Sequence, residues 1–289
     1  MPSEAFEFIC SAMRERNNQV LTLEERRANA EGAIDLMPPP DDVTISDAHA
    51  GGVPAEWVEA PDASRERVIL YLHGGAYTSC SPRTHRRLTA ALSREAHARV
   101  LTIDYRLAPE HPFPAAVEDA VAAYRWLLER NASARIAVAG DSAGGGLALA
   151  LLFRLREERI ALPSCAVLLS PWTDLEATHD DVTDDPMLDA GRLKQSADMY
   201  LAGADARSPL ASPVYGDLSG LPPMLVHVAA DEMLVGDSER VVERARQRGV
   251  DVTFEAVPGM FHVWHIFAGY VPESDDAVAK VGAFLRERL

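Results

Sequence analysis

The sequence predicts an α/β fold built on a mostly parallel sheet, and three observations support this. Near-continuous apolar runs such as VILYL, IAVAG and AVLLS are typical of parallel strands that are buried on both faces. Helical patterns lie between most of these runs, which indicates a doubly wound sheet flanked by helices. The chain has 289 residues, of which 47% are hydrophobic, enough for a full core.

Eight strands are expected, and most are separated by helices. The strands are predicted at 43–46, 55–59, 68–73, 100–104, 135–139, 165–170, 224–229 and 252–257. The helices between and after them are predicted at 83–97, 114–130, 143–158, 236–248 and 274–288.

Two segments stand outside this alternation. Residues 1–42 are predicted to form an N-terminal helical segment, with helices at 3–15 and 22–34, the second opened by a capping box between Thr22 and Glu25. The prolines at 38–40 end this segment, so the main domain is expected to span 43–289. Residues 174–222 are too long for an ordinary connection, which predicts a functional insertion with one helix near 189–202.

Composition excludes several classes of function. A net charge of −16 and a pI near 5.0 oppose binding to nucleic acid, because a phosphate backbone would be repelled. The three cysteines have no paired spacing, so no disulfide framework is expected. No metal-binding motif is present, so we expect neither a metal nor another cofactor. No apolar run has the length of a signal peptide or a membrane span, so we expect a cytoplasmic protein without a stable membrane anchor.

The motif Gly140-Asp141-Ser142-Ala143-Gly144 carries the first chemical signal. It is the one G-x-S-x-G sequence in the chain, it follows a predicted strand, and it opens a predicted helix. That context is the one a nucleophile elbow requires, in which a sharp turn exposes the serine at the top of the sheet. No lysine follows the glycines, which argues against a phosphate-binding loop. Ser142 is therefore the predicted nucleophile.

A serine hydroxyl needs a base, and four histidines follow Ser142 along the chain. His262 follows the last predicted strand in a loop at its carboxyl end, where ligand and catalytic groups gather in open α/β sheets. His265 is the rival, three residues later. His227 lies within a predicted strand and His179 within the insertion, so both are less suited. We predict His262 as the base.

The residue that orients this histidine should follow the preceding strand, since the order on this architecture is serine, acid, histidine. Asp231 comes directly after the strand at 224–229. Glu232 and Asp237 are the alternatives: Glu232 is expected to point elsewhere from the same turn, and Asp237 to lie in the next helix. We predict Asp231 in the role of fixing the imidazole tautomer and stabilising the imidazolium.

The block His73-Gly74-Gly75-Ala76 follows the strand at 68–73. Glycines allow backbone N–H groups to turn toward a substrate oxygen with no side chain in the way. The N–H of Ala143, directly after the nucleophile, is a further donor. These groups predict an oxyanion hole.

The chain resembles the hormone-sensitive-lipase-like esterases, or bacterial family IV, from about His73 to its C-terminus. Four blocks carry the resemblance, and their order and spacing together are specific: HGGAY at 73–77, DYRLAPE at 104–110, GDSAGG at 140–145 and GMFH at 259–262. The third block is similar to that of the family's GDSAG subgroup. Two positions depart from the family pattern: Ala76 replaces the usual third glycine, and Glu232-Met233-Leu234 follows Asp231 where proline or a small residue is common.

The resemblance implies the α/β-hydrolase fold, with an eight-stranded core and a helical cap made of the N-terminal segment and the insertion. It also implies that Gly74, Gly75 and Ala143 donate to the oxyanion. We further expect Tyr77, Trp172 and Phe261 to line the substrate pocket.

The function predicted is a serine carboxylesterase that acts on short-to-medium acyl esters or lactones through an acyl-enzyme on Ser142. The lactone class follows from a general similarity to the monoterpene ε-lactone hydrolases of this group. An amidase or formamidase with the same triad is an alternative, and so is a ligand-binding protein on a hydrolase scaffold. The expected partner is a small-molecule ester or lactone, and a homodimer is compatible with the sequence.

Overall fold

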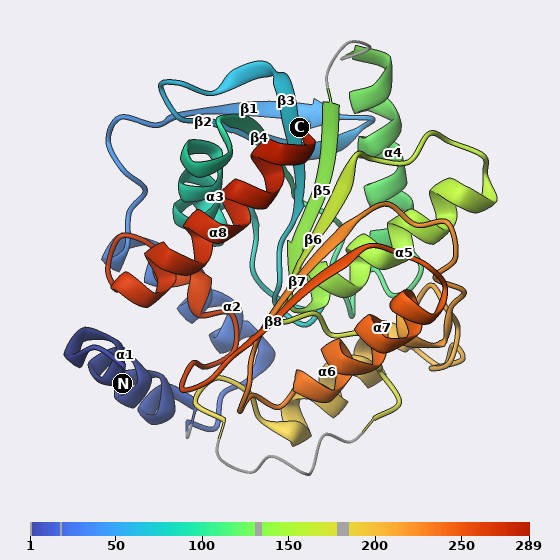
Figure 1. The fold of residues 1–289 in the computed structure, drawn as a ribbon. Coiled ribbons are helices and arrows are strands. Elements are labelled where there is room, and N and C mark those ends of the chain that lie inside the picture. Colours follow the sequence, from blue (N-terminus) through green and yellow to red (C-terminus); the bar gives the residue numbers. More distant parts are fainter. Residues whose placement is uncertain (1, 18, 131–134, 178–184) are drawn as a thin grey trace.

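The computed structural model describes residues 2–17, 19–130, 135–177 and 185–289. Within these ranges the core is one eight-stranded sheet in the order β1-β2-β4-β3-β5-β6-β7-β8 (Figure 1). The strands are β1 (Thr44–Ala50), β2 (Val53–Glu59), β3 (Ser64–Leu72), β4 (Ala98–Ile103), β5 (Arg135–Asp141), β6 (Cys165–Leu169), β7 (Met224–Ala229) and β8 (Val252–Val257). All eight expected strands are present, and the expected α/β-hydrolase architecture is confirmed.

The sheet is antiparallel only at one edge. β1 pairs with β2, and β2 with β4, in antiparallel fashion, whereas the remaining neighbours are parallel. β1 is longer than the expected 43–46 because it forms a hairpin with β2. The turn consists of Gly51 and Gly52, both with positive φ (64° and 91°), a conformation that glycine adopts without a steric penalty.

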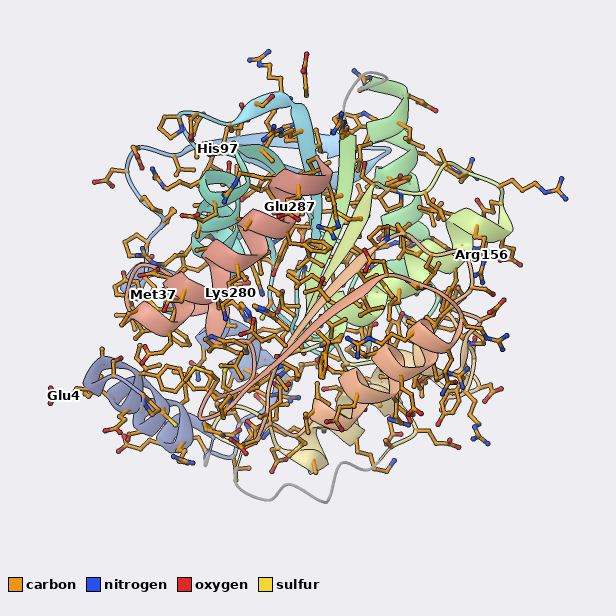
Figure 2. All side chains as sticks on the ribbon, in the orientation of Figure 1. Glu4, Met37, His97, Arg156, Lys280 and Glu287 are labelled. Carbon is orange, nitrogen blue, oxygen red and sulfur yellow. The ribbon has the colours of Figure 1, made fainter. Side chains whose placement is uncertain are left out.

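Helices cover both faces of the sheet (Figure 1). One face is covered by α3 (Pro82–Ala96) and α8 (Pro272–Arg288), and the other by α4 (Ala115–Arg130), α5 (Ala143–Glu157) and α7 (Val235–Gln247). β3 shows why its sequence reads as a continuous apolar run: Leu70 and Leu72 enter one core, while Ile69 and Tyr71 enter the other. Side chains fill the space between the sheet and both helical layers (Figure 2).

Three further helices lie beyond the carboxyl ends of the parallel strands (Figure 1). They are α1 (Glu4–Asn17), α2 (Leu23–Gly32) and α6 (Ala190–Leu201), and short 3₁₀ turns occur at Ala33–Leu36, Pro213–Tyr215 and Trp264–Phe267. The expected capping box of Thr22 and Glu25 opens α2. The Asn17 side chain joins the N-terminal segment to the insertion, because its amide nitrogen donates to the Leu188 carbonyl at 2.8 Å. None of the helices described has the length and apolar character needed to cross a membrane.

Arg27 on α2 fastens this helix to the main domain. Its guanidinium donates to the carbonyl oxygens of Thr78 (2.7 Å) and Ala108 (2.8 Å) and makes two hydrogen bonds to the Glu110 carboxylate (2.7 and 2.8 Å). A planar guanidinium matches this set of acceptors better than a lysine ammonium would. The N-terminal segment is therefore held against the loops that follow β3 and β4.

Candidate active site

Ser142 occupies a strained turn between β5 and α5. Its φ and ψ are 52° and −122°, outside the regions that side chains favour, and its N–H donates to the Leu169 carbonyl at 2.8 Å. The turn is tight enough that a Cβ on Gly144 would lie 1.9 Å from the Leu72 carbonyl oxygen, so only glycine fits there. This is the strand–turn–helix geometry expected of a nucleophile elbow.

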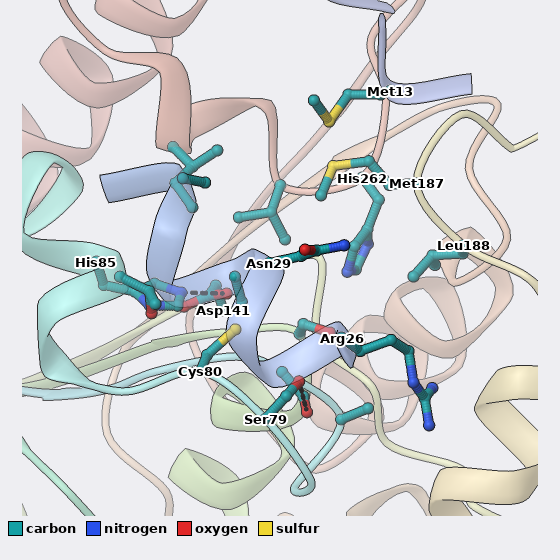
Figure 3. Close-up of a pocket in the computed structure, with 18 of the residues that line it drawn as sticks. Met13, Arg26, Asn29, Ser79, Cys80, His85, Asp141, Met187, Leu188 and His262 are labelled. Atoms are coloured by element: carbon teal, nitrogen blue, oxygen red, sulfur yellow. Dashed lines mark hydrogen bonds and ion pairs between the residues drawn. The ribbon is translucent and has the colours of Figure 1, made fainter. Parts of the chain in front are cut away.

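Ser142 and His262 line the same cavity, which has a volume of about 450 Å³. Its walls include the loop after β3, the helices α1 and α2, and the start of the segment that leads into α6. Figure 3 shows Met13, Met187 and Leu188 on the His262 side of the cavity, and His85 with Asp141 on the opposite side. Within the ranges that the structure covers, no group of three or more histidine, cysteine or acidic side chains is arranged to hold a metal ion.

His262 is buried and paired with Glu232. Its Nδ1 lies 2.9 Å from Oε1 of Glu232, an arrangement in which Nδ1–H donates and Nε2 keeps a lone pair. Burial is the largest single influence and lowers the pKa of His262, but the Glu232 carboxylate, with smaller contributions from Asp185 and Asp141, raises it, and the net result lies above the ordinary value of 6.5. The imidazolium form of His262 is thus stabilised at the cavity that Ser142 also lines.

Glu232 is itself held in place through its other carboxylate oxygen. Oε2 accepts hydrogen bonds from Ser170 Oγ at 2.7 Å and from the Ala229 N–H at 3.1 Å. The Ser170 hydroxyl also accepts from the Val263 N–H at 3.2 Å, directly beside His262. A buried carboxylate needs such partners, and here they also fix its orientation toward the histidine.

The prediction that Asp231 would contact the histidine is wrong in this structure. The Asp231 side chain is exposed, and its Oδ2 accepts from the Gly259 N–H at 3.2 Å, in the turn after β8. Glu232, by contrast, is 1% exposed. The two neighbours leave the turn after β7 in opposite directions, and Glu232 takes the inner one. Asp237 lies in α7, as expected, and accepts from the Thr173 N–H at 2.7 Å.

The other histidines lie elsewhere. His265 is fully buried, and its Nε2 lies 3.2 Å from Nδ1 of His227, whose Nε2 in turn contacts the Glu255 carboxylate at 3.0 Å. Burial, together with His227, holds the pKa of His265 well below its usual range. The alternative His179 lies outside the described residues. Of the candidates that the structure describes, His262 is the one that lines the cavity with Ser142.

The expected oxyanion donors need one correction. The Gly74 N–H donates to the buried Asp141 carboxylate at 3.0 Å, so it is not available to a substrate. The N–H groups of Gly75, Ala76 and Ala143 have no acceptor among the described residues. Gly75 and Ala76 line the cavity, and both have positive φ (109° and 53°). The donor set that the geometry favours is therefore Gly75, Ala76 and Ala143.

The three aromatic residues expected in the pocket are core residues instead. Tyr77 stacks on Tyr200 with ring centroids 3.9 Å apart, and Phe261 stacks on Phe6 of α1 at 4.8 Å. Tyr77, Trp172 and Phe261 are each 1% exposed, and none belongs to the lining that the described residues form. Aliphatic side chains from both segments outside the sheet line the cavity in their place: Met13, Leu21, Ile34, Leu36, Met37, Met187, Leu188 and Leu193.

Sequence reasoning also missed Asp185, which fixes the turn that carries Glu232. One Asp185 oxygen accepts from the Met233 N–H at 3.0 Å, and the other from the N–H groups of Met187 (2.8 Å) and Leu188 (3.0 Å). Its position before Pro186 is typical of an aspartate that caps a turn, and this was the available signal. The side chain thus joins the insertion to the turn after β7.

Comparison with known proteins identifies the family of the chain. A model of the α/β hydrolase fold family matches residues 69–266. An acetyl-hydrolase of Streptomyces hygroscopicus is 48% identical over 255 residues, covering 86% of this chain and 83% of that protein. An esterase of Acinetobacter venetianus is 36% identical over 255 residues, covering 86% of this chain and 84% of that protein.

Solved structures extend the match to the whole chain. A crystal structure of an esterase from the bacterial hormone-sensitive lipase family superposes with a TM-score of 0.96 at 45% identity and covers 100% of this chain and 99% of that one. The esterase EstE5, in crystals soaked with p-nitrophenyl butyrate, has a TM-score of 0.92 at 41% identity, with 99% of each chain covered. The expected family is confirmed: this chain is an esterase of the hormone-sensitive lipase family, within the α/β hydrolases.

Proposed function

We propose that this protein is a serine carboxylesterase that hydrolyses short-to-medium acyl esters or lactones through an acyl-enzyme on Ser142. One observation carries the proposal: Ser142, on a strained elbow, shares a cavity with His262, whose Nδ1 is paired with the buried Glu232 carboxylate. A nucleophile, a base and an acid that orients the base are the parts that acyl transfer requires.

The reaction follows from these positions. Nε2 of His262 accepts the Ser142 proton while Oγ attacks the ester carbonyl carbon, and Glu232 stabilises the resulting imidazolium. The carbonyl oxygen becomes an oxyanion, which accepts hydrogen bonds from the N–H groups of Gly75, Ala76 and Ala143. When the tetrahedral species collapses, the bond to the alcohol breaks and His262 returns the proton to the leaving oxygen. Water then attacks the acyl-enzyme by the same route and releases the acid.

The size of the cavity supports a small substrate. About 450 Å³ lies within the range of small-molecule pockets, and its aliphatic lining suits a short acyl chain. The acetyl-hydrolase and the esterase soaked with a butyrate ester are relatives whose names point to short acyl groups. We expect the best activity with acyl chains of roughly two to eight carbons and weak activity with long-chain triglyceride.

A panel of substrates tests the proposal. It contains p-nitrophenyl esters from acetate to palmitate, a seven-membered lactone, and a p-nitroanilide. We expect kcat/KM to be highest for the short esters, with measurable opening of the lactone. Faster turnover of the anilide than of the matched ester would identify an amidase, and no turnover of any ester by folded protein would identify a binding protein.

The cap is the second part of the proposal, because both segments outside the sheet contribute to the cavity. Met13 lies on α1 and Met187 in the insertion. Met13→Trp and Met187→Trp should each reduce the room for acyl carbons and shift the chain-length optimum toward acetate. Val20→Trp is the matched control, because Val20 is fully exposed and lies outside the lining. An unchanged optimum in both cavity variants would contradict a role for these segments in substrate selection.

A further inference from the structure

A buried network lies behind the loop that follows β3. The Asp141 carboxylate, directly before the nucleophile, accepts hydrogen bonds on Oδ1 from the Tyr71 hydroxyl (2.7 Å) and the Gly74 N–H (3.0 Å). Its Oδ2 lies 3.3 Å from Nε2 of His85 on α3, and Figure 3 shows this pair beside the cavity. All three side chains are almost completely buried. The reaction derived above uses none of them.

Peptide geometry connects this network to the proposed oxyanion donors. In a trans peptide unit, the C=O of one residue and the N–H of the next point in opposite directions. The Gly74 carbonyl accepts from Nδ1 of His73 at 2.7 Å, which fixes the direction of the Gly75 N–H. The Gly75 carbonyl accepts from the N–H groups of Thr78 and Ser79, both at 3.0 Å, which fixes the direction of the Ala76 N–H.

Asp141 holds the first residue of this loop by direct contact. A Cβ on Gly74 would lie 2.2 Å from Oδ2 of Asp141, so the carboxylate rests against the backbone of the loop. A shift of the carboxylate must therefore move Gly74, and with it the peptide unit that carries the Gly75 N–H. A misplacement of about 1 Å in such a group can cost about 100-fold in rate.

Two side chains fix the carboxylate from the side away from the loop. Tyr71 is fully buried near the carboxyl end of β3. His85 is fixed through Nδ1, which lies 2.8 Å from Thr84 Oγ1, and its Nε2 then faces Asp141. Burial is the largest single influence and lowers the pKa of His85, but the Asp141 carboxylate, together with the Ser81 carbonyl and Glu31, raises it above the ordinary value, so the histidine is suited to donate to Asp141.

We propose that His85 and Tyr71 are positioning residues for the transition-state oxyanion: they hold the Asp141 carboxylate, which holds the Gly74 amide and so directs the N–H groups of Gly75 and Ala76. This inference rests on the proposed ester hydrolysis and adds to it. Because the oxyanion forms only after attack, these residues should affect turnover and the binding of transition-state mimics more than the binding of substrate.

The experiment compares Tyr71→Phe, His85→Gln and His85→Phe with the wild type. Each is assayed for kcat and KM with p-nitrophenyl acetate, and for inhibition by an alkyl trifluoromethyl ketone, whose adduct with serine carries an oxyanion. Tyr124→Phe is the matched control: it removes the hydroxyl of another buried tyrosine, which donates to the Ala161 carbonyl at 3.0 Å, far from the cavity. Thermal melting of every variant measures the purely structural cost.

We expect kcat to fall by about 10- to 100-fold in His85→Phe, which is somewhat less than the loss of a whole oxyanion donor would cost. The decrease in Tyr71→Phe should be smaller. KM should stay within about twofold, and ketone affinity should fall in parallel with kcat/KM. His85→Gln, which retains an N–H donor, should recover part of the loss. Tyr124→Phe should change stability alone.

Two results would overturn the proposal. One is a normal kcat and normal ketone affinity in variants that simply melt at a lower temperature, as the control does. The other is a change confined to KM. If His85→Phe does not fold, Tyr71→Phe decides, because Tyr71 does not line the cavity and loses one hydroxyl without a change of shape. A wild type that hydrolyses no ester would instead contradict the proposed function.

Discussion

Nδ1 of His262 lies 2.9 Å from Oε1 of Glu232, while the neighbouring Asp231 contacts the backbone of Gly259. Two adjacent acidic residues therefore have different surroundings: one carboxylate is buried against the imidazole and the other is exposed at a turn. Only a carboxylate in the first position can select the tautomer and stabilise the imidazolium during acyl transfer. The pair offers a direct test of the proposed triad within one turn of the chain.

Replacing these two acids separately should give opposite results. Glu232→Gln keeps the shape of the side chain but removes the charge that stabilises the imidazolium, so kcat should fall by about 10³ to 10⁴. Asp231→Asn should keep kcat within about threefold, as expected of an exposed surface substitution. Steady-state kinetics with p-nitrophenyl butyrate measures both. A large loss in Asp231→Asn with a normal Glu232→Gln would restore the assignment first made from the sequence.

The pH dependence of kcat/KM should report the titration of His262. The imidazolium cannot accept the Ser142 proton, so activity is lost as pH falls through the pKa of the free enzyme. Since the nearby carboxylates, Glu232 first among them, raise the pKa of His262 above 6.5 despite its burial, the acidic limb should lie above 6.5. Glu232→Gln removes the largest of the contributions that raise the pKa of His262 while burial remains, so the residual activity should show an acidic limb displaced to lower pH. If the acidic limb of the kcat/KM profile lies at the same pH in the wild type and in Glu232→Gln, that result would argue against the pairing of Glu232 with His262.

Ser142→Ala should abolish nearly all hydrolysis while the protein still folds. Loss of a triad nucleophile typically costs about 10⁴ to 10⁶ in turnover. The wild type should also form a covalent adduct with an organophosphate, and peptide mapping should locate it at Ser142. An adduct on another residue, or wild-type activity in the alanine variant, would contradict the assignment.

Ser170→Ala should loosen the position of the Glu232 carboxylate without exposing the cavity to solvent. The hydroxyl donates to Oε2 of Glu232 and accepts from the Val263 N–H, so its removal frees both of the loops that carry the proposed acid and base. We expect kcat to fall by about tenfold, since hydrogen bonds to charged groups are worth about 1.5–3 kcal/mol.

Ser238→Ala provides the control for this substitution. Ser238 is equally buried, yet its hydroxyl has no hydrogen-bond partner among the described residues. Its replacement should leave kcat unchanged. Equal kcat in the two serine variants would show that Ser170 has no part in orienting Glu232.

The fold and the nucleophile were accessible to sequence reasoning because their signals are local. The buried strands appear as apolar runs, and the elbow around Ser142 is a short motif whose conformation requires small residues on either side. The hairpin of β1 and β2 extended further than expected, although Gly51 and Gly52 mark its turn.

The acid and the oxyanion donors depended on contacts that are distant along the chain. The inward position of Glu232 involves Ser170, 62 residues earlier, whose hydroxyl donates to the Glu232 carboxylate. The Gly74 N–H is likewise unavailable because Asp141 accepts it from another strand. Neither choice is encoded in the spacing of the residues concerned, so a pattern read from the sequence leaves the alternatives open.

The Arg27 contacts have a consequence for engineering. One guanidinium holds α2 to the carbonyls of Thr78 and Ala108 and to the Glu110 carboxylate, so a single side chain links the N-terminal segment to the loops that follow β3 and β4. A chimera that takes its N-terminal helices from a relative also takes that relative's residue at the position of Arg27. Such a graft should dock more firmly if it brings an arginine at the position of Arg27, because the acceptors of that guanidinium stay behind on the recipient. Exchange of specificity between family members is thus governed by an attachment point outside the cavity as well as by the residues that line it.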